Sequence, residues 1–283
     1  MIRFATEKDI NGIISLWSEA FGDSEREIRF FLDNKFKPEN TLIYEICGEA
    51  VSMLFLLEGN MIINGAEYPS YYLYAACTAK KCRGRGIMAE LLEKAKLLAS
   101  ERNKCFICLM PGEKTLFDFY ERFGYKTVFT RKKLYIKAAD LTDYKSENNK
   151  FKFSDYYEKR NFAFSRFNRF EWDNDSIEFA CKSQILYGGG AMNLSKGYAL
   201  YNKNESGITV KEFAFAECDF SDALNYLFEH TNSDYAVVYL PLDYQTDYGK
   251  FEIEFSAMAI SVNPEYDYLV DEFNNAYLGL TLD

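Results

Sequence analysis

Segments with helical periodicity alternate with short apolar runs through the first half of the chain. Apolar residues spaced three and four apart predict amphipathic helices at 10–17, 25–34, 87–98 and 113–123. Runs rich in β-branched and aromatic residues predict strands at 2–5, 41–47, 50–59, 61–65, 71–77, 105–111 and 126–137. This alternation predicts an α/β fold with a mixed sheet and a first domain over residues 1–137.

The second half of the chain has a similar order of predicted elements. Residues 208–215 read as a strand, and 219–241 read as a helix, a buried strand and a proline. In the first half, the elements that end at Pro111 have the same order of strand, helix, strand and proline. This similarity favours an internal duplication. The alternative is that both halves simply have the order of elements that is common in α/β proteins. The polar stretch 138–150 predicts a linker and leaves residues 151–283 as a second domain.

Composition narrows the classes of function. The 283 residues carry a formal net charge of −10, which disfavours nucleic acid as a partner and suits a cationic small substrate. His230 is the only histidine, so catalysis by a Ser-His or Cys-His pair is disfavoured. The first residues include no long apolar run, so we expect neither a signal peptide nor a membrane span.

The seven cysteines favour a reduced, cytoplasmic protein, because their number is odd and most lie in apolar surroundings. Cys105 and Cys108 form a CxxC pattern, for which a zinc or redox site is one interpretation. The pattern has no flanking glycines and no second ligand pair. We therefore expect buried strand thiols and no metal.

Positive charge and glycine gather at 80–86, between a strand that ends near Thr78 and a helix that begins near Gly86. The free N–H groups at a helix N-terminus attract anions, and glycines allow a close approach of the backbone. The segment, KKCRGRG, is not a Walker loop, because no GK[ST] follows. A pyrophosphate site and an ordinary solvated helix start both remain open. The corresponding segment before the second helix, AECDFSD, is acidic and has no glycine, so it cannot bind the same group in the same way.

The context of this segment resembles the GNAT acyltransferase superfamily. RGRGIM (83–88) follows a strand and precedes the LMP and FYERFGY segments at 109–111 and 119–125, and the resemblance covers residues 1 to about 137. The family pattern Q/R-x-x-G-x-G/A falls on Arg83, Gly86 and Met88. A bulky residue at position 88 departs from the family pattern and is similar to the branch of enhanced-intracellular-survival aminoglycoside acetyltransferases.

That branch carries a second GNAT-like domain without a cofactor. The resemblance therefore implies a GNAT acyltransferase fold at 1–137, followed by a degenerate GNAT-like α/β domain at 151–283 that contributes to the substrate cleft. Typical members of the branch are longer and add a sterol-carrier-like third domain, for which we expect no room here.

The resemblance also implies roles for individual residues. In GNAT proteins the strand before the pyrophosphate-binding segment separates from its neighbour, and its backbone pairs with the pantetheine amides of CoA. The resemblance therefore implies that Ala76, Cys77 and Thr78 bind the pantetheine arm. The pyrophosphate would accept hydrogen bonds from N–H groups of the cradle residues Arg83, Gly84, Arg85, Gly86, Ile87 and Met88. Tyr120 matches a tyrosine near the departing sulfur, where a phenol can donate to the thiolate. The alternative is a core tyrosine on the apolar face of its helix.

The acceptor of the amine proton is harder to assign. An amine with a pKa near about 10.4 is neutral in fewer than roughly one molecule in a thousand at pH 7, so a carboxylate or a water relay is needed. Strand 71–77 has no acidic residue, and Glu58 is a candidate whose alternative is a surface strand end. The enhanced-survival relatives are understood to use a terminal carboxylate, which implies Asp283; a surface terminus is the alternative.

Together these features predict an acetyl-CoA-dependent N-acetyltransferase that acts on a small, cationic amine by direct transfer in a ternary complex. The rival is a non-catalytic acyl-CoA-binding or scaffold protein, which the missing acidic residue on strand 71–77 favours. Transfer of another acyl group is a third option. The sequence identifies neither the amine nor the oligomeric state.

Overall fold

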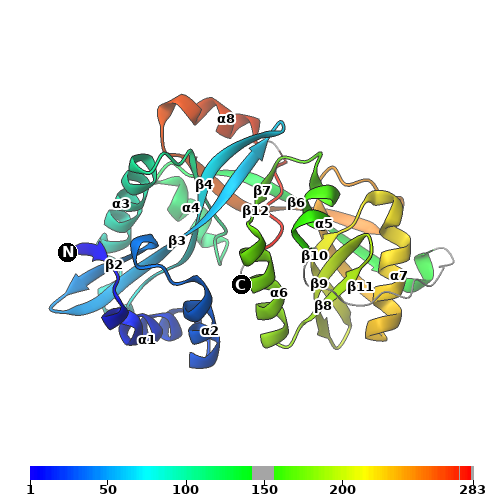
Figure 1. Cartoon of the computed structure of the whole chain (residues 1–283), viewed down its shortest axis with the longest axis horizontal. Helices are drawn as coiled ribbons and strands as arrows, with labels where there is room; N and C mark the ends of the chain where they lie inside the picture. Colours follow the sequence, from blue (N-terminus) through cyan, green and yellow to red (C-terminus); the bar gives the residue numbers. More distant parts are fainter. Residues whose placement is uncertain (142–155, 274, 282–283) are drawn as a thin grey trace. The chain divides into compact units, whose positions relative to one another are not determined.

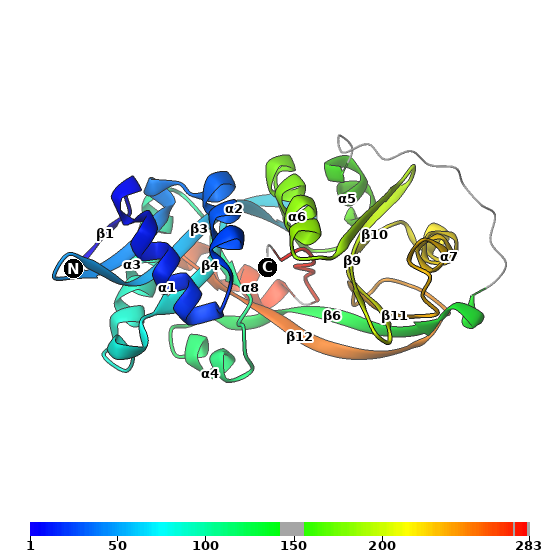
Figure 2. The same ribbon diagram turned by 90° about the horizontal axis from the view of Figure 1, so that it is seen from below.

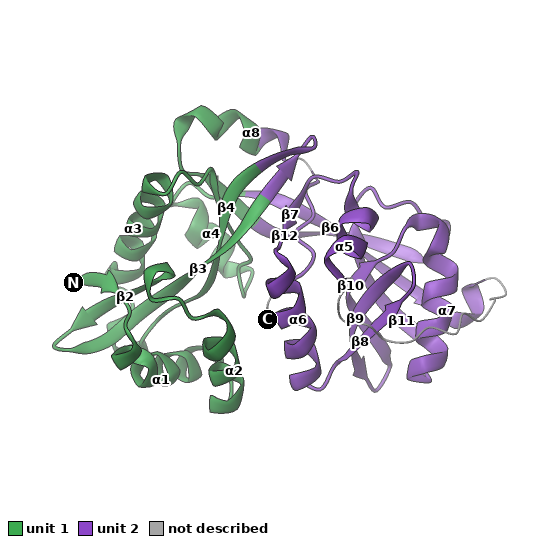
Figure 3. Cartoon of the chain, in the orientation of Figure 1, with its two compact units in different colours: residues 1–60, 68–126, 258–270 green, residues 61–67, 127–257, 271–283 purple. Residues whose placement is uncertain are grey.

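The computed structural model describes residues 1–141, 156–273 and 275–281 and divides into two compact units (Figures 1 and 3). Unit 1 comprises residues 1–60, 68–126 and 258–270, and unit 2 comprises residues 61–67, 127–257 and 271–283. Neither unit is contiguous in the sequence. Helices and a mixed sheet make up the chain, which confirms the predicted α/β class.

Unit 1 is a sheet of six strands in the order β1-β2-β3-β4-β5-β12. Its strands are β1 (Ile2–Phe4), β2 (Thr41–Ile46), β3 (Glu49–Ile63), β4 (Ala66–Thr78), β5 (Phe106–Leu109) and the end of β12 (Lys250–Ser261). Its helices are α1 (Ile10–Phe21), α2 (Glu25–Lys35), α3 (Ile87–Glu101), α4 (Thr115–Glu121) and most of α8 (Asp267–Glu272). Strands β4 and β5 are parallel and are joined by α3, whereas β1/β2, β2/β3 and β5/β12 are antiparallel.

Helices cover both faces of this sheet. Alternate residues of a strand point to opposite faces, and here apolar residues at both alternating positions need to be buried. On one face, the predicted apolar side of α3 packs with Leu54 of β3 and Leu73 of β4 in a continuous core. On the other face, Trp17 of α1 lies 5.6 Å from Phe55 between ring centroids, and Phe31 of α2 stacks on Tyr74 at 4.9 Å. The central strands of unit 1 therefore lie between two layers of helices.

In unit 2 the order of hydrogen-bonded strands is β12-β6-β11-β10-β9-β8, which continues the strand order of unit 1 through the shared β12. Its strands are β6 (Lys126–Lys137), β8 (Gly190–Leu194), β9 (Gly197–Asn204), β10 (Gly207–Ala214), β11 (Tyr235–Pro241) and the first part of β12; β7 (Arg169–Glu171) lies outside this path. Its helices are α5 (Tyr156–Phe164), α6 (Asn174–Leu186) and α7 (Phe220–Thr231). Six short 3₁₀ helices occur along the described chain, at Glu7–Asp9, Pro38–Asn40, Lys80–Cys82, Ala138–Asp140, Glu217–Asp219 and Pro264–Tyr266.

The two units share one arrangement of strands. Parallel strands β4 and β5 are joined by α3 in unit 1, and parallel strands β10 and β11 are joined by α7 in unit 2. In each unit an antiparallel strand lies beside the second parallel strand: the end of β12 pairs with β5, and β6 pairs with β11.

These last strands place residues differently from the domain boundaries expected from the sequence. Residues 127–137, assigned above to the first domain, lie in unit 2, and residues 258–270, assigned to the second domain, lie in unit 1. The periodicity of a segment shows that it forms a strand, but not which strand it pairs with. Of the predicted linker, Ala138–Asp140 forms a 3₁₀ helix, and 142–150 lies outside the described residues.

The last described residues are anchored inside unit 2. Arg160 is fully buried, pairs with buried Glu212 at 2.7 Å, and also donates to the Leu278 carbonyl oxygen. The indole N–H of Trp172 donates to the Leu280 carbonyl oxygen at 2.9 Å. The apolar tail is thus tucked into this unit as far as Leu280. Of the helices described, none is long and apolar enough to cross a membrane.

Candidate active site

The site begins where β4 continues beyond its neighbour. Residues Ser70, Tyr71 and Tyr72 of β4 pair in parallel with β5, and β5 then ends at Leu109. Strand β4 runs on to Thr78, so its last six residues extend past the paired region. The separation of these two strands leaves space at the carboxyl ends of parallel strands, which is where α/β sheets place ligands.

Two features shape the free end of β4. Ala75 has a φ of 47°, a left-handed conformation that is uncommon for a residue other than glycine and interrupts the regular pleat of the strand. Buried Ser52 of β3 donates from its hydroxyl to the Cys77 carbonyl oxygen at 2.7 Å and lies 2.8 Å from the Thr78 hydroxyl. Strand β3 therefore fixes the end of β4. The alternation of apolar and polar residues along the strands predicted neither the left-handed conformation of Ala75 nor the hydrogen bond from Ser52.

We expect Ser52→Ala to raise the KM for acetyl-CoA, the acyl donor that the sequence predicts, several-fold and to lower the free energy of unfolding by about 1–3 kcal/mol, because a buried carbonyl loses its partner. Ser70→Ala is the matched control, since its buried hydroxyl bonds a backbone oxygen of the same strand at 2.8 Å but lies in the paired region. Steady-state kinetics and chemical denaturation measure both effects. Equal KM values for the two variants would contradict a positioning role for Ser52.

The segment after β4 turns into α3 through two glycines in left-handed conformations. Gly84 has a φ of +76° and Gly86, the residue before the helix, a φ of +78°; a Cβ at either would meet no atom within 4 Å. The side chain of Arg83 folds back, and its Nε donates to the Thr78 carbonyl oxygen at 3.0 Å. The first helical amide that bonds back is that of Glu90, to the Gly86 carbonyl oxygen.

The preceding amides, from Gly84 to Ala89, have no backbone acceptor among the described residues. They form the free N–H end of a helix, with positive dipole and no side chain over the glycines. This geometry suits a phosphate group, as the sequence predicts.

A cavity of about 740 Å³ lies over this segment, within unit 1. Its size falls inside the usual range for small-molecule sites, about 300–1,000 Å³. Eight of the nine predicted cofactor-binding residues line it: Ala76, Cys77, Thr78, Arg83, Gly84, Gly86, Ile87 and Met88. Arg85 is exposed and does not line the cavity.

Other parts of the cavity wall come from residues that sequence reasoning missed. Phe21 ends α1, Phe119 is in α4, and Glu113 and Arg122 lie just before and just after that helix. The guanidinium of Arg122 lies 5.5 Å from the centroid of the Phe119 ring. The sequence offered one signal for this wall: Phe21 is an aromatic residue directly before Gly22, the glycine that ends α1, and it is half-exposed in the structure.

Tyr120 lies in the same cavity, on α4. Its side chain is 7% exposed, and burial raises the pKa of its phenol to about 12. Its ring packs edge-on against Phe119 and Tyr125, at 5.2 and 5.5 Å between centroids. Among the described residues its hydroxyl has no hydrogen-bond partner. Tyr120 thus presents a protonated, unpaired donor to the cavity.

Burial likewise raises the pKa of the Cys77 thiol to about 12, so this thiol is protonated at neutral pH and is a poor nucleophile. Cys105 and Cys108 are buried, and burial raises the pKa of the Cys108 thiol. Within the described residues, no group of three or more His, Cys, Asp or Glu side chains is placed to hold a metal ion.

Of the two candidate bases, the structure describes only Glu58, which does not line the cavity. Glu58 pairs loosely with Lys104, at 4.0 Å, and Lys104 lies over the ring of Tyr71. Tyr71 is in the paired part of β4, six residues or roughly 20 Å along the strand from Cys77. Glu58 of β3 therefore lies beside the paired part of β4, away from the free end of β4 that lines the cavity. Asp283 lies outside the described residues.

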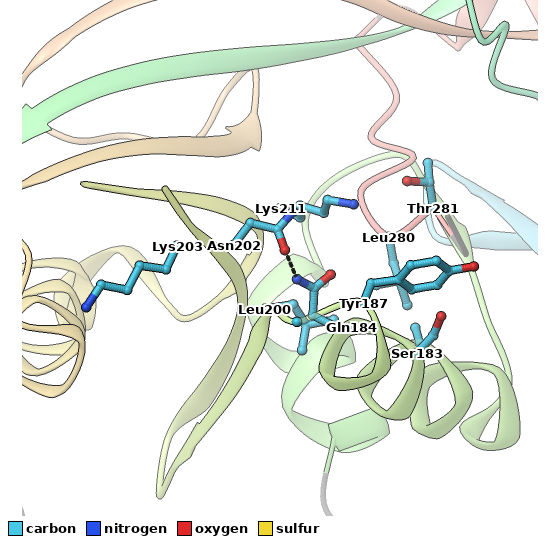
Figure 4. A pocket seen from close by; sticks show the side chains of 11 residues that line it. Ser183, Gln184, Tyr187, Leu200, Asn202, Lys203, Lys211, Leu280 and Thr281 are labelled. Atoms are coloured by element: carbon cyan, nitrogen blue, oxygen red, sulfur yellow. Dashed lines mark hydrogen bonds between the residues drawn. The ribbon is translucent and has the colours of Figure 1, made fainter. Parts of the chain in front are cut away.

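The described part of unit 2 has no glycine-containing turn before its helix like that of unit 1; its cavities include an open one of about 530 Å³ at the C-terminal end of α7. The turn before α7 carries Glu217 and Asp219 in place of the glycines, and these pair with Arg166 and Lys196. A small cavity between α6, β9 and the last described residues has only about 150 Å³, below the range of ligand sites (Figure 4). Its polar groups also satisfy one another, since the Gln184 amide donates to Asn202.

Comparisons with known proteins agree with this geometry. Residues 1–128 match the family model described as an acetyltransferase (GNAT) domain. No protein among the curated ones matches the sequence.

Solved structures match over most of the chain. A GCN5-related N-acetyltransferase from Kribbella flavida is 16% identical over 93% of this chain and 72% of its own, with a TM-score of 0.72. Another from Anabaena variabilis ATCC 29413 is 13% identical over 93% and 73%, with a TM-score of 0.77.

Eis1 from Mycobacterium abscessus is 12% identical over 93% of this chain and 74% of its own, with a TM-score of 0.70. At these identities the matches establish the fold, and they include a member of the enhanced-intracellular-survival branch. Residues 1–128 therefore carry a GNAT acetyltransferase domain, and most of the chain shares the fold of solved GNAT N-acetyltransferases.

Proposed function

We propose that the cavity of unit 1 binds acetyl-CoA and that the protein transfers the acetyl group directly to a small, cationic amine in a ternary complex. One observation carries the proposal: a single cavity joins the free end of β4, the open amides before α3 and the unpaired hydroxyl of Tyr120. These are the parts that a pantetheine chain, a pyrophosphate and a leaving sulfur each require.

In this proposal the amides from Gly84 to Met88 bind the pyrophosphate, and the exposed end of β4 pairs with the pantetheine arm. The amine nitrogen attacks the thioester carbonyl, the C–S bond breaks, and Tyr120 donates a hydrogen bond or its proton to the sulfur. Holding both substrates in line supplies most of the acceleration.

The described lining supports a cationic acceptor. Phe21, Phe119 and Phe123 line the cavity, and aromatic rings can attract cations. Glu113 adds a carboxylate to the same wall, and Glu19 lies nearby, where it accepts the Lys80 amide at 3.1 Å. Either carboxylate, or Asp283, can take the amine proton through water.

Two further parts of the proposal concern the whole chain. The matching β-α-β arrangement with acidic residues before α7 supports unit 2 as a degenerate GNAT-like domain without its own cofactor. All seven cysteines are free, which supports a location in the cytoplasm.

Release of free thiol tests the function. The protein is mixed with acetyl-CoA and a panel of polyamines, aminoglycosides and peptide amines, and we expect thiol release that depends on one class of amine. A propionyl-CoA arm tests the choice of acyl group. Tight CoA binding without turnover on any amine would contradict the proposal and favour a non-catalytic acyl-CoA-binding protein. The absence of acidic residues from the free end of β4 supports that alternative.

A further inference from the structure

Residues 250–257 of β12 form an exposed edge of the unit 2 sheet. One side of β12 lies along β6 (Figure 2). On its other side, β5 pairs only with residues 258–261. Along 250–257 the backbone groups of that second side therefore have no strand partner among the described residues. An open edge of this kind is a template for pairing with another strand.

Three apolar side chains of this edge are exposed on one face. Phe251, Ile253 and Phe255 are 53%, 55% and 70% exposed, and as alternate residues they point the same way. The ammonium of Lys132 lies 4.6 Å from the centroid of the Phe251 ring, so this is the face of the sheet that is buried elsewhere. A contiguous exposed apolar strip indicates a binding surface rather than scattered surface residues.

The acidic residues of the edge are already paired on the opposite face. Glu252 accepts a hydrogen bond from the Tyr135 hydroxyl at 2.9 Å, and Glu254 pairs with Arg131 at 2.9 Å and with Lys133 at 3.3 Å. Edge strands commonly avoid association through unpaired charges. Here the neighbouring strand pairs Glu254 with two cations and gives Glu252 a hydroxyl donor, so neither carboxylate is left unpaired at the edge.

We propose that this edge binds the same edge of a second copy of the chain, as an antiparallel pair of β12 strands with a twofold axis at Ile253. The sequence from 251 to 255, FEIEF, reads the same in both directions. Phe251 of one copy then lies opposite Phe255 of the other, and Ile253 lies opposite itself. Such self-complementarity is what a twofold interface requires.

This register also keeps the charges balanced. Glu252 lies opposite Glu254 of the other copy, and the arginine and lysine of each copy stand beside this acidic pair. The apolar strip becomes continuous across both sheets, with cross-strand pairs that include aromatic rings. The inference involves unit 2 only and is independent of the function proposed for the unit 1 cavity.

Sedimentation of the full chain over a range of concentrations tests the pairing. We expect a dimer for the natural sequence, and a dissociation constant at least about 100-fold higher for Ile253→Lys, which places two ammonium groups face to face. The control is Ile185→Lys on α6, since Ile185 is similarly exposed, at 49%. A monomeric natural protein, or a dimer that survives Ile253→Lys, would overturn the proposal.

Crosslinking tests the register itself. With a short bismaleimide, Ile253→Cys should give a covalent dimer well above the background from exposed Cys47 and Cys218, because residues at the axis have Cβ atoms about 5 Å apart. Ile185→Cys should stay at that background. Equal crosslinking of the two variants would overturn the strand pairing.

Discussion

Replacing Gly86 with glutamate is expected to weaken CoA binding at least about 100-fold. Its φ of +78° and the open space beside it place any new side chain over the amides before α3. A carboxylate there faces the pyrophosphate, and two unit charges about 4 Å apart repel by about 4 kcal/mol at an effective dielectric constant of about 20. Calorimetric titration with CoA measures the loss.

Backbone strain contributes to any such variant, so the control must share it. Gly65, in the turn between β3 and β4, has a φ of +80° and the same open surroundings. Gly65→Glu therefore carries the same cost of a left-handed conformation, about 1–2 kcal/mol, without approaching the cavity. We expect its CoA affinity to match that of the natural protein. Retained affinity in Gly86→Glu would show that the phosphates bind elsewhere.

Replacing Tyr120 with phenylalanine should lower kcat about 100-fold or more and leave CoA affinity unchanged, since only the donor to the leaving sulfur is lost. Tyr125→Phe is the control: Tyr125 is also buried, its ring lies 5.5 Å from that of Tyr120, and it does not line the cavity. We expect its kcat to stay close to that of the natural protein. Equal kcat for Tyr120→Phe and the natural protein would leave Tyr120 as a core residue only.

The pH profile provides a separate readout. Because burial raises the pKa of Tyr120 to about 12, its hydroxyl stays protonated from pH 6 to 9. The kcat should therefore rise with pH as the amine loses its proton, without a falling limb from Tyr120 in that range. A falling limb that disappears in Tyr120→Phe would contradict this assignment.

The sequence predicted the local elements of the site well because their signals are local. Helical spacing located α3, and the glycines marked the turn before it. Tyr120 was predicted from the resemblance of FYERFGY to the GNAT superfamily, and the structure places it in the cavity lining. The structure adds two features without any sequence pattern: the left-handed Ala75 and the bond from Ser52, which joins residues 25 positions apart.

Strand partners were the part that sequence could not supply. Strand β6 follows unit 1 directly in the chain yet pairs with β11, and the end of β12 returns to β5. Apolar alternation is the same whichever neighbour a strand has, so the domain boundary at 137 was misplaced by this exchange. The sequence also could not identify the base: Glu58 lies near the end of a predicted strand, but its contacts place it beside Lys104 and Tyr71, away from the cavity lining.

Hydrogen exchange at the amides of residues 84–88, with and without saturating CoA, tests the central claim most directly. If the open amides before α3 hold the pyrophosphate, their exchange should slow on addition of CoA, while the turn at Gly65 stays unchanged. Unchanged exchange at 84–88 in protein that has bound CoA would contradict the account.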